Sequence, residues 1–296
     1  MDYTLLLIVV LLVVIGLVIL YSTSAYNGQV KFHDSFYYLK KQAFATVLGI
    51  VLMLFVAGMD YHIWQRLAVF GYLAAVALSV AVMLFGREIN GSKRWLALGP
   101  FSFQPSEFAK VALILFLADL VTKNVKTIGK MWTLCRIMFW ILPIVGLVGA
   151  SNLSTAIIIL GIGVILIFVA SPKYAQFALM GIAGACFMGI FLALESYRLE
   201  RLAIWRNPEK YEKGYQTLQG LYAIGSGGVF GVGIGNSVQK LGFVPEAQND
   251  MIFSIICEEL GLAGAGIIVF LFLLLIWRFF LIASGSRDLF GALIAT

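Results

Sequence analysis

Long apolar runs separated by short polar segments make up almost the whole chain. A helix needs about 20 mainly apolar residues to cross the hydrocarbon core of a bilayer. The runs therefore predict eight complete transmembrane helices and the start of a ninth. The eight are expected at residues 5–21, 43–59, 67–85, 108–121, 137–150, 156–170, 176–194 and 251–277.

The ninth apolar run, residues 289–296, is too short to cross a membrane. As a helix it would rise about 12 Å, against a hydrocarbon core of about 30 Å. We therefore expect that the sequence is a fragment of a longer protein. The longest stretch between runs, residues 195–249, is expected to form a large loop.

The composition agrees with this pattern, since 61% of the residues are hydrophobic and 12% are charged. Soluble domains are about a quarter charged. The sequence therefore predicts an all-α fold, a polytopic transmembrane helix bundle that forms one integral membrane domain over residues 1–296. The net charge of +6 does not indicate a nucleic-acid partner, because Lys and Arg residues commonly flank membrane helices and contact anionic headgroups.

The charges leave the orientation of the helices open. The loop after the fourth run carries Lys123, Lys126, Lys130 and Arg136 without an acidic residue, which favours a cytoplasmic position for this loop. With that loop inside, however, most of the chain's 21 Lys and Arg residues would lie outside. Charge bias alone gives no decision between the two orientations.

The first polar segment of chemical interest, REINGSKRWLALGPFSFQPSEFAK, covers residues 87–110. Lys93 and Arg94 precede Trp95, so two cations lie beside an indole ring of the kind that prefers the membrane interface. One interpretation is an interfacial loop with ordinary anchoring residues. The other is an anion site near the headgroups, in which Lys93, Arg94 and Lys110 bind a group such as a lipid pyrophosphate.

The same segment ends in the start of a helix. Ser106 is expected to cap this helix, and Glu107 would lie in its first turn. Glu107 and Lys110 are three residues apart, so we expect them to form an ion pair.

A glycine-rich segment precedes the last complete run, with six glycines between Gly225 and Gly235. A phosphate-binding loop would need a following Gly-Lys-Ser/Thr, and a dinucleotide-binding fold would need a preceding strand. The sequence has neither. We expect these glycines to let backbone at membrane depth bend or pack closely, which is tolerated where the backbone lines a polar cavity.

Four carboxylates lie at or inside the start of the eighth run, in LGFVPEAQNDMIFSIICEELG (residues 241–261). Ionisable groups at membrane depth are costly and commonly have a function. If the helix begins near Asp250, Glu258 lies about 12 Å deeper. We expect Glu246 and Asp250 to border one cavity at the water boundary, where Asp250 can exchange a proton with a substrate. Glu258 and Glu259 are expected to pair with buried cations, to cap another helix or to be neutral.

Three segments together resemble the SEDS family of polytopic membrane proteins, which includes RodA, FtsW and SpoVE. They are NGSKRWLALG…QPSEFAK (90–110), GYQTLQGLYAIGSGGVFGVGIGNSVQKL (214–241) and VPEAQNDMIF…EELG (244–261). The resemblance extends over nearly the whole chain and is nearest the FtsW/SpoVE branch. It implies ten transmembrane helices with cytoplasmic termini, so that the loop 195–249 would lie outside the cytoplasm.

The resemblance also implies an activity, that of a peptidoglycan glycosyltransferase that polymerises lipid II into glycan strands for septal or spore cell-wall synthesis. Such an enzyme is expected in the bacterial plasma membrane, with its active site facing outside. Its expected partners are a class B penicillin-binding protein and other divisome or elongasome membrane proteins. Matching the family's motifs residue by residue implies Asp250 as the catalytic residue and, for substrate binding, Arg94, Trp95, Glu107, Lys110, Lys240 and Glu246.

The chain departs from the family's usual pattern at two places. NDM (249–251) stands where the family commonly has Thr-Asp-Phe, a change that keeps the acid. SNLST (151–155) stands where the family usually has Pro-Asp-x-Gly-Thr, which loses a carboxylate and a glycine. No function is therefore assigned to Asn152.

The implied reaction suits the chemistry of these residues. A sugar hydroxyl must lose a proton as it attacks the anomeric carbon, and Asp250 is our candidate for the base. The departing undecaprenyl pyrophosphate needs positive charge, for which Lys93, Arg94, Lys110 and Lys240 are candidates, or a divalent cation such as Mg²⁺ or Mn²⁺. No other cofactor is expected. One base without an enzymic nucleophile predicts inversion at the anomeric carbon.

Two other functions stay open for such a chain. A transporter that flips lipid II would also use a polar cavity between broken helices at membrane depth. A non-catalytic scaffold of the divisome would chiefly bind the penicillin-binding protein. Replacing Asp250 by Asn in vesicles that contain lipid II would separate these functions from the glycosyltransferase.

Overall fold

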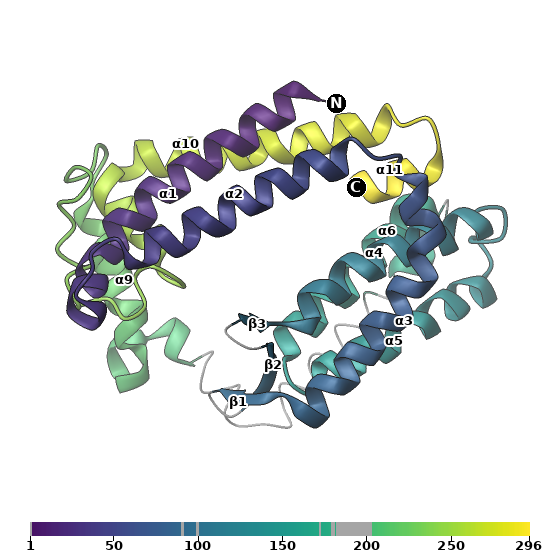
Figure 1. Cartoon of the computed structure of the whole chain (residues 1–296), viewed down its shortest axis with the longest axis horizontal. Helices are drawn as coiled ribbons and strands as arrows, with labels where there is room; N and C mark the ends of the chain where they lie inside the picture. The colour runs from purple at the N-terminus through teal and green to yellow at the C-terminus, as the bar shows by residue number, and fades with distance from the viewer. Residues whose placement is uncertain (1, 90–91, 99–100, 172, 179–180, 182–202) are drawn as a thin grey trace. The chain divides into compact units, whose positions relative to one another are not determined.

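The computed structural model describes residues 2–89, 92–98, 101–171, 173–178, 181 and 203–296 (Figure 1). Nearly all regular structure in these residues is α-helix, which confirms the predicted all-α class. The chain divides into two compact units. Unit 1 comprises Met1–Gly58 and Ala185–Arg278, and unit 2 comprises Met59–Gly184 and Phe279–Thr296. That residues 1–296 form one membrane domain stays a prediction.

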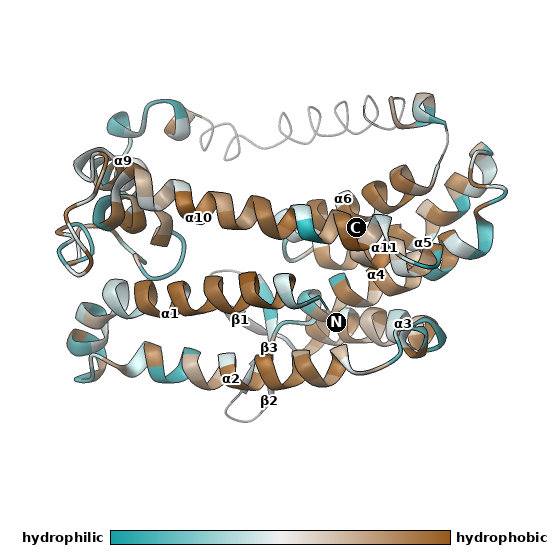
Figure 2. Cartoon of the chain, turned by 90° about the horizontal axis from the view of Figure 1, so that it is seen from above, coloured by the Kyte–Doolittle hydropathy of each residue, from teal (hydrophilic) through white to brown (hydrophobic). Residues whose placement is uncertain are grey.

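Six of the described helices are long and apolar enough to cross a membrane. They are α1 (Tyr3–Phe32), α2 (Tyr37–Ala57), α3 (His62–Phe85), α5 (Met131–Gly149), α6 (Leu153–Ala170) and α10 (Ile252–Ser284). Figure 2 shows hydrophobic residues along these helices and polar residues mainly at their ends. These helices support the predicted polytopic membrane fold.

The remaining apolar runs have different outcomes. The fourth run is α4 (Pro105–Asn124), which has 20 residues but includes two acidic and two basic side chains. Its crossing of the membrane stays a prediction. The seventh run, residues 176–194, lies mostly outside the described residues, and the ninth forms α11 (Leu289–Ala295). The count of eight complete spans therefore also stays a prediction.

Helix α1 is longer than the hydropathy pattern predicts. The predicted spans leave residues 22–42 as a loop, but α1 continues to Phe32 and α2 begins at Tyr37, so the loop covers only residues 33–36. The prediction of that loop was wrong because polar residues such as Ser22 are buried against distant parts of the chain. Hydropathy along the sequence does not reveal such partners.

Unit 1 is built from α1, α2, α9 and most of α10. Helix α1 packs against α2, and a buried cluster joins α1 to α10 through Ile19, Ile256, Cys257, Ala265 and Ile268. The segment expected as a long loop contains η1 (Pro208–Lys210), η2 (Glu212–Gly214) and α9 (Tyr215–Ser226). A second cluster, formed by Ala223, Val244, Ala247 and Ile255, packs α9 onto the start of α10.

Unit 2 is built around α4, which packs against α3, α5, α6 and α11. Leu113, Leu117 and Val121 of α4 are fully buried in the main hydrophobic core. This central position explains how α4 can be less apolar than its neighbours, since little of its surface faces outward.

The polar segment after α3 forms a small antiparallel sheet instead of an irregular loop. Its strands β1 (Arg87–Ile89), β2 (Ser92–Leu98) and β3 (Phe101–Phe103) lie in that order. Lys93 of β2 is opposite Glu88 of β1. The sheet comes directly before α4 in the chain and carries the Lys-Arg-Trp motif on its central strand.

Candidate active site

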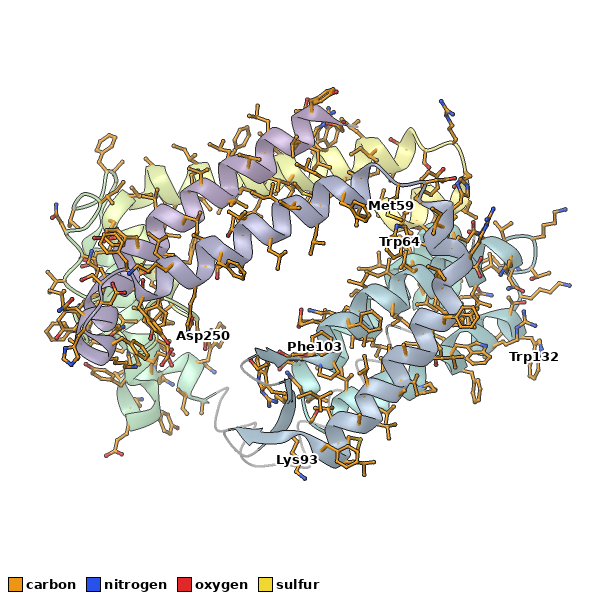
Figure 3. The ribbon with its side chains drawn as sticks, viewed as in Figure 1. Met59, Trp64, Lys93, Phe103, Trp132 and Asp250 are labelled. Atoms are coloured by element: carbon orange, nitrogen blue, oxygen red, sulfur yellow. The ribbon has the colours of Figure 1, made fainter. Side chains whose placement is uncertain are left out.

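Burial separates the four carboxylates of the stretch 241–261 into two pairs. Glu246 and Asp250 are exposed, whereas Glu258 and Glu259 are only 3% and 1% exposed. The predicted division into a boundary pair and a buried pair is confirmed. One detail is corrected, since α10 begins at Ile252 and leaves Asp250 on the turn before it (Figure 3).

Asp250 ends a segment of turns that we call the Asp250 loop (residues 236–250). The Asn249 side chain donates to Glu246 Oε2 at 2.7 Å, and the Asn249 N–H donates to the Glu246 carbonyl at 2.9 Å. Glu246 itself has a left-handed φ of 52°, which is uncommon for a residue with a side chain. Among the described residues the Asp250 carboxylate has no hydrogen bond or ion pair, so it is available to a substrate.

Glu259 is the centre of a buried polar cluster. Lys240 Nζ lies 2.6 Å from Glu259 Oε1, and both side chains are almost completely buried. The Ser22 hydroxyl, from α1, donates to Glu259 at 2.6 Å and accepts from Lys240 Nζ at 2.9 Å. The expectation that Glu259 pairs with a buried cation is confirmed.

This cluster changes the interpretation of Lys240. Lys240 is 5% exposed, and its ammonium group already has two partners inside the protein. The predicted role in substrate binding stays a prediction, and the geometry favours a structural role.

Glu258 is satisfied by hydrogen-bond donors of the Asp250 loop. The Ser237 hydroxyl donates to one of its carboxylate oxygens, and the Val238 N–H donates to the other at 3.0 Å. A carboxylate that accepts such bonds can be buried without a cation. Adjacent residues of α10 thus both bind the same loop.

The glycine-rich segment pairs with a break in α10. Gly261 has φ 67° and ψ −170°, which interrupts the helix, and unpaired backbone groups at membrane depth are costly. The Leu262 N–H donates to the Gly228 carbonyl at 2.9 Å. The Val232 N–H donates to the Glu258 carbonyl at 2.9 Å. The segment therefore supplies the partners that the break in the helix removes.

This pairing requires glycine at two positions of the glycine-rich segment. A Cβ atom on Gly227 would lie 1.9 Å from the Cys257 carbonyl oxygen, and one on Gly231 would lie 2.2 Å from the Glu259 carbonyl oxygen. The predicted close packing of this backbone is confirmed. That it lines a polar cavity stays a prediction.

In unit 2, the residues of the Lys-Arg-Trp motif differ in their contacts. Lys93 is exposed and has no partner among the described residues (Figure 3). Arg94 Nε donates to the Ser151 carbonyl at 2.9 Å, and Trp95 is partly buried on the same strand. Arg94 therefore connects β2 to the turn between α5 and α6.

The predicted Glu107–Lys110 ion pair is confirmed, with 2.8 Å between Lys110 Nζ and Glu107 Oε2. The predicted cap of α4 was wrong by two residues. Gln104 is the N-cap and Pro105 follows it in the first turn, a position where the missing N–H of proline costs nothing. Ser106 instead accepts a hydrogen bond from the Gln104 side chain at 2.9 Å.

A small cavity in unit 2 lies where the starts of α4 and α6 meet Arg94. Gln104, Ser106, Ser151 and Asn152 are among the residues that line it. Asn152 caps α6, since its side chain accepts the Thr155 N–H at 3.3 Å. No local pattern predicts this arrangement, because Arg94 and Ser151 are 57 residues apart in the chain.

The structure thus places the predicted site residues in two groups. Lys240, Glu246 and Asp250 belong to unit 1. The members in unit 2 are Lys93, Arg94, Trp95, Glu107 and Lys110. Among the described residues, no group of three or more His, Cys, Asp or Glu side chains is arranged to hold a metal ion.

Two buried or partly buried acids of unit 2 were missed. Asp119 of α4 is 4% exposed; it accepts from Lys123 Nζ at 2.6 Å and from Gln65 Nε2 at 3.0 Å. The spacing of Asp119 and Lys123, four residues apart in a helix, was a usable signal.

The second missed acid is Asp288, which caps α11. It accepts from the Gly291 N–H at 2.6 Å, from the Tyr61 hydroxyl at 2.8 Å and from His62 Nε2 at 2.9 Å. These donors, the Gly291 N–H first, hold the pKa of Asp288 below its usual range. Tyr61 and His62 are 227 and 226 residues away in the sequence, so these two partners left no local signal.

Comparison with known proteins shows which family the chain belongs to. The sequence model of the Cell cycle protein family, FtsW/RodA/SpoVE, matches residues 3–296. The chain belongs to the FtsW/RodA/SpoVE family. This membership confirms the resemblance to SEDS proteins and, with the six apolar helices, identifies a multi-pass membrane protein.

Two FtsW/RodA/SpoVE relatives illustrate the similarity. Stage V sporulation protein E of Bacillus subtilis is 38% identical over 307 residues, which cover 99% of this chain and 82% of the relative. The probable peptidoglycan glycosyltransferase FtsW of Trichlorobacter lovleyi is 34% identical over 300 residues, which cover 99% of this chain and 79% of the relative.

Solved structures of the family have the same fold. A chain of a peptidoglycan synthase complex, studied for its coordination of polymerization and crosslinking, is 28% identical and matches with a TM-score of 0.79 over 99% of this chain and 81% of that chain. The rod shape determining protein RodA of Thermus thermophilus is 26% identical, with a TM-score of 0.69 over 99% of this chain and 79% of that chain.

Proposed function

We propose that the protein is a peptidoglycan glycosyltransferase that polymerises lipid II into glycan strands for septal or spore cell-wall synthesis. The observation that carries the proposal is the Asp250 carboxylate, which is exposed at the start of an apolar helix and has no partner among the described residues. The names of several relatives and the similarity to a chain of a peptidoglycan synthase complex support the same activity.

In the proposed reaction, Asp250 acts as a general base. A sugar hydroxyl of the acceptor attacks the anomeric carbon of the donor, and its proton passes to the Asp250 carboxylate. The new C–O bond forms as the bond between the anomeric carbon and the pyrophosphate oxygen breaks. A single displacement of this kind inverts the configuration at the anomeric carbon.

The leaving pyrophosphate needs cationic partners, and the structure ranks the candidates by availability. Lys93 is exposed without a partner among the described residues. Within the described residues, Arg94 uses only its Nε, in the bond to Ser151, which leaves the two terminal nitrogens for an anion. Lys110 shares its charge with Glu107. We therefore propose Lys93 and Arg94 as the principal pyrophosphate-binding residues, with Trp95 as their neighbour at the membrane interface.

A divalent cation such as Mg²⁺ or Mn²⁺ remains part of the proposal as a group that would neutralise the pyrophosphate. Mg²⁺ is commonly bound by one or two carboxylates together with substrate phosphates. The exposed carboxylate of Glu246 fits that requirement and would leave Asp250 free to act as the base, with the remaining oxygens supplied by the substrate.

The partner and the location follow from the same proposal. A class B penicillin-binding protein would cross-link the strands that this protein polymerises, beside other divisome or elongasome membrane proteins. The protein would lie in the bacterial plasma membrane with Asp250 facing outside, where lipid II sugars are joined. Similarity to a chain of a complex that couples polymerization and crosslinking supports this arrangement.

The test of the proposal is Asp250→Asn in the purified protein with its penicillin-binding partner and lipid II. We expect the rate of glycan formation to fall about 100-fold or more, the usual contribution of a general base. Glu209→Gln is the matched control, because Glu209 is an exposed acid of the same long segment, on η1. It should leave the rate unchanged.

Other outcomes would support the alternatives. Normal polymerisation by the Asp250→Asn protein would contradict the assignment of the base. Wild-type protein that moves lipid II across vesicle membranes but forms no glycan would indicate a transporter. Variants that lose only the binding of the penicillin-binding protein would favour a scaffold.

A further inference from the structure

The Asp250 loop has few regular backbone hydrogen bonds of its own, yet it must hold a base in place. Its residues form turns and no regular helix or strand. Segments of this kind open easily unless side chains fix them. The contacts that fix this loop lie behind it, in the buried cluster that the proposed reaction does not use.

We propose that Lys240, Glu259 and Ser22 are positioning residues, which clamp the Asp250 loop to α1 and α10 and so fix the place of the Asp250 carboxylate. The inference rests on the proposed function of Asp250. None of the three is proposed to touch the substrate.

The first argument is that the cluster joins three separate elements. Lys240 comes from the loop, Glu259 from α10 and Ser22 from α1, and the bonds among them measure 2.6 to 2.9 Å. Ser22 bridges the ion pair, because its one hydroxyl proton goes to the carboxylate while its oxygen accepts from the ammonium group. The loop therefore cannot move away from α10 without leaving a buried charge unpaired, and it cannot move away from α1 without losing the bond between Lys240 and Ser22.

The second argument is that further bonds fix the same loop at both of its ends. Near its start, Ser237 donates to Glu258 of α10. Near its end, Asn27 Nδ2 of α1 donates to Gln248 Oε1 at 2.9 Å. Gln248 is 6% exposed and lies two residues before Asp250. The contacts of Lys240 lie between these two points.

The third argument is the strained residue inside the clamped region. Glu246 keeps a left-handed backbone of φ 52°, and such conformations persist where the surroundings enforce them. A loop released from α1 and α10 would relax this residue and displace Asp250. A misplacement of about 1 Å can lower a rate about 100-fold, so the clamp would affect catalysis without contacting the substrate.

The experiment separates positioning from stability by replacing the buried pair with apolar residues, Lys240→Met with Glu259→Leu. Such replacements often leave the fold as stable as before. The matched control is Lys123→Met with Asp119→Leu, which removes another ion pair between a lysine and a buried carboxylate, within a single helix of unit 2. Both doubles are compared with wild type in the complex with the penicillin-binding partner.

Two measurements are made on protein of equal folded fraction. We expect amide hydrogen exchange in residues 236–250 to become about 10-fold faster or more in the Lys240/Glu259 double. We expect kcat for lipid II polymerisation to fall about 10- to 100-fold, with KM changed less than about 3-fold, because the clamp does not bind substrate. The Lys123/Asp119 double should change neither quantity.

Ser22→Ala keeps the inference testable if the double does not fold. This variant keeps the ion pair and removes only the bridge to α1. Amide exchange should therefore become faster and kcat should fall, as in the Lys240/Glu259 double, but each by a smaller factor. Unchanged exchange in residues 236–250 would overturn the clamp, whatever the protein catalyses. Faster exchange with unchanged kcat would overturn the positioning role. A failure of the proposed function would be seen in a separate experiment, in which the Asp250→Asn protein would polymerise lipid II at the normal rate.

Discussion

At the scale of single residues, Gly231 shows how closely the glycine-rich segment is packed. Its φ of 77° lies in the left-handed region, and a Cβ atom there would lie 2.2 Å from the Glu259 carbonyl oxygen. Gly225 of α9 has neither feature, because its φ is not positive and no heavy atom lies within 4 Å of its Cβ position. The two glycines are therefore a matched pair that differs only in local constraint.

We expect Gly231→Ala to lower the free energy of unfolding by about 2 kcal/mol or more. A left-handed backbone costs about 1 to 3 kcal/mol for a residue with a side chain, and the Glu259 backbone would also have to move. Gly225→Ala should be neutral or stabilise by up to about 1 kcal/mol, since alanine favours helix. Denaturant unfolding in one detergent measures both, and equal midpoints for the two variants would contradict the argument.

At the scale of elements, α11 shows how a short helix is fixed in unit 2. Phe290 and Leu293 are 1% and 0% exposed in the main core. Asp288 accepts bonds from its own helix and from Tyr61 and His62, at the start of α3. One carboxylate thus joins α11 to a segment more than 200 residues away, as the separation of 227 residues between Tyr61 and Asp288 shows.

This arrangement predicts a pH dependence of stability. The pKa of Asp288 is lower in the folded protein than its ordinary value of 3.8, first because of the Gly291 N–H. A depressed folded pKa means that the carboxylate stabilises the fold above the unfolded pKa and that this stabilisation is lost as pH falls through the folded pKa. We expect Asp288→Asn to be less stable than wild type at pH 7 and to lose less stability between about pH 5 and pH 3.

Thermal unfolding midpoints across that pH range would check the prediction. Asparagine can still cap a helix, so the comparison reports mainly on the charge. Glu209→Gln, at an exposed acid of η1, should keep the wild-type slope. If Asp288→Asn also kept the wild-type slope, the stabilising charge would have to lie elsewhere.

Elements also show which parts of the fold the sequence could predict. Apolar runs were sufficient to find α1, α2, α3, α5, α6 and α10, because burial in lipid depends on composition over a window of about 20 residues. The end of α1 was not predictable, since the partners of Ser22 are 218 and 237 residues away. Polar groups paired over such distances have no local pattern.

The candidate site was predictable to a similar extent. Depth along a helix separated Asp250 from Glu258 and Glu259, because the rise per residue is fixed. The partner of Glu259 was not predictable, since Lys240 belongs to an irregular loop. The spacing of residues in the sequence does not predict the path of such a loop. Arg94 and Ser151, which meet across 57 residues, were out of reach for the same reason.

At the scale of the whole molecule, the charges of the described residues bear on membrane orientation. Lys126, Lys130 and Lys173 are exposed in unit 2 and have no acidic partner among the described residues. Glu209 and Glu212 are exposed in the segment between the predicted seventh span and α10. Short basic loops favour the cytoplasmic side. The predicted orientation, with residues 195–249 outside the cytoplasm, therefore agrees with the charges of the loop after α4 but is not decided by them.

Cysteine labelling can decide this orientation and test the predicted seventh span together. In a protein whose Cys135, Cys186 and Cys257 are replaced by serine, we expect Glu212→Cys to react with a membrane-impermeant maleimide in intact cells. Lys126→Cys should react only after the membrane is opened. Helices α5 and α6 and the predicted span at 176–194 separate the two positions, and three crossings put them on opposite sides. Labelling of both from the same side would show that residues 176–194 do not cross.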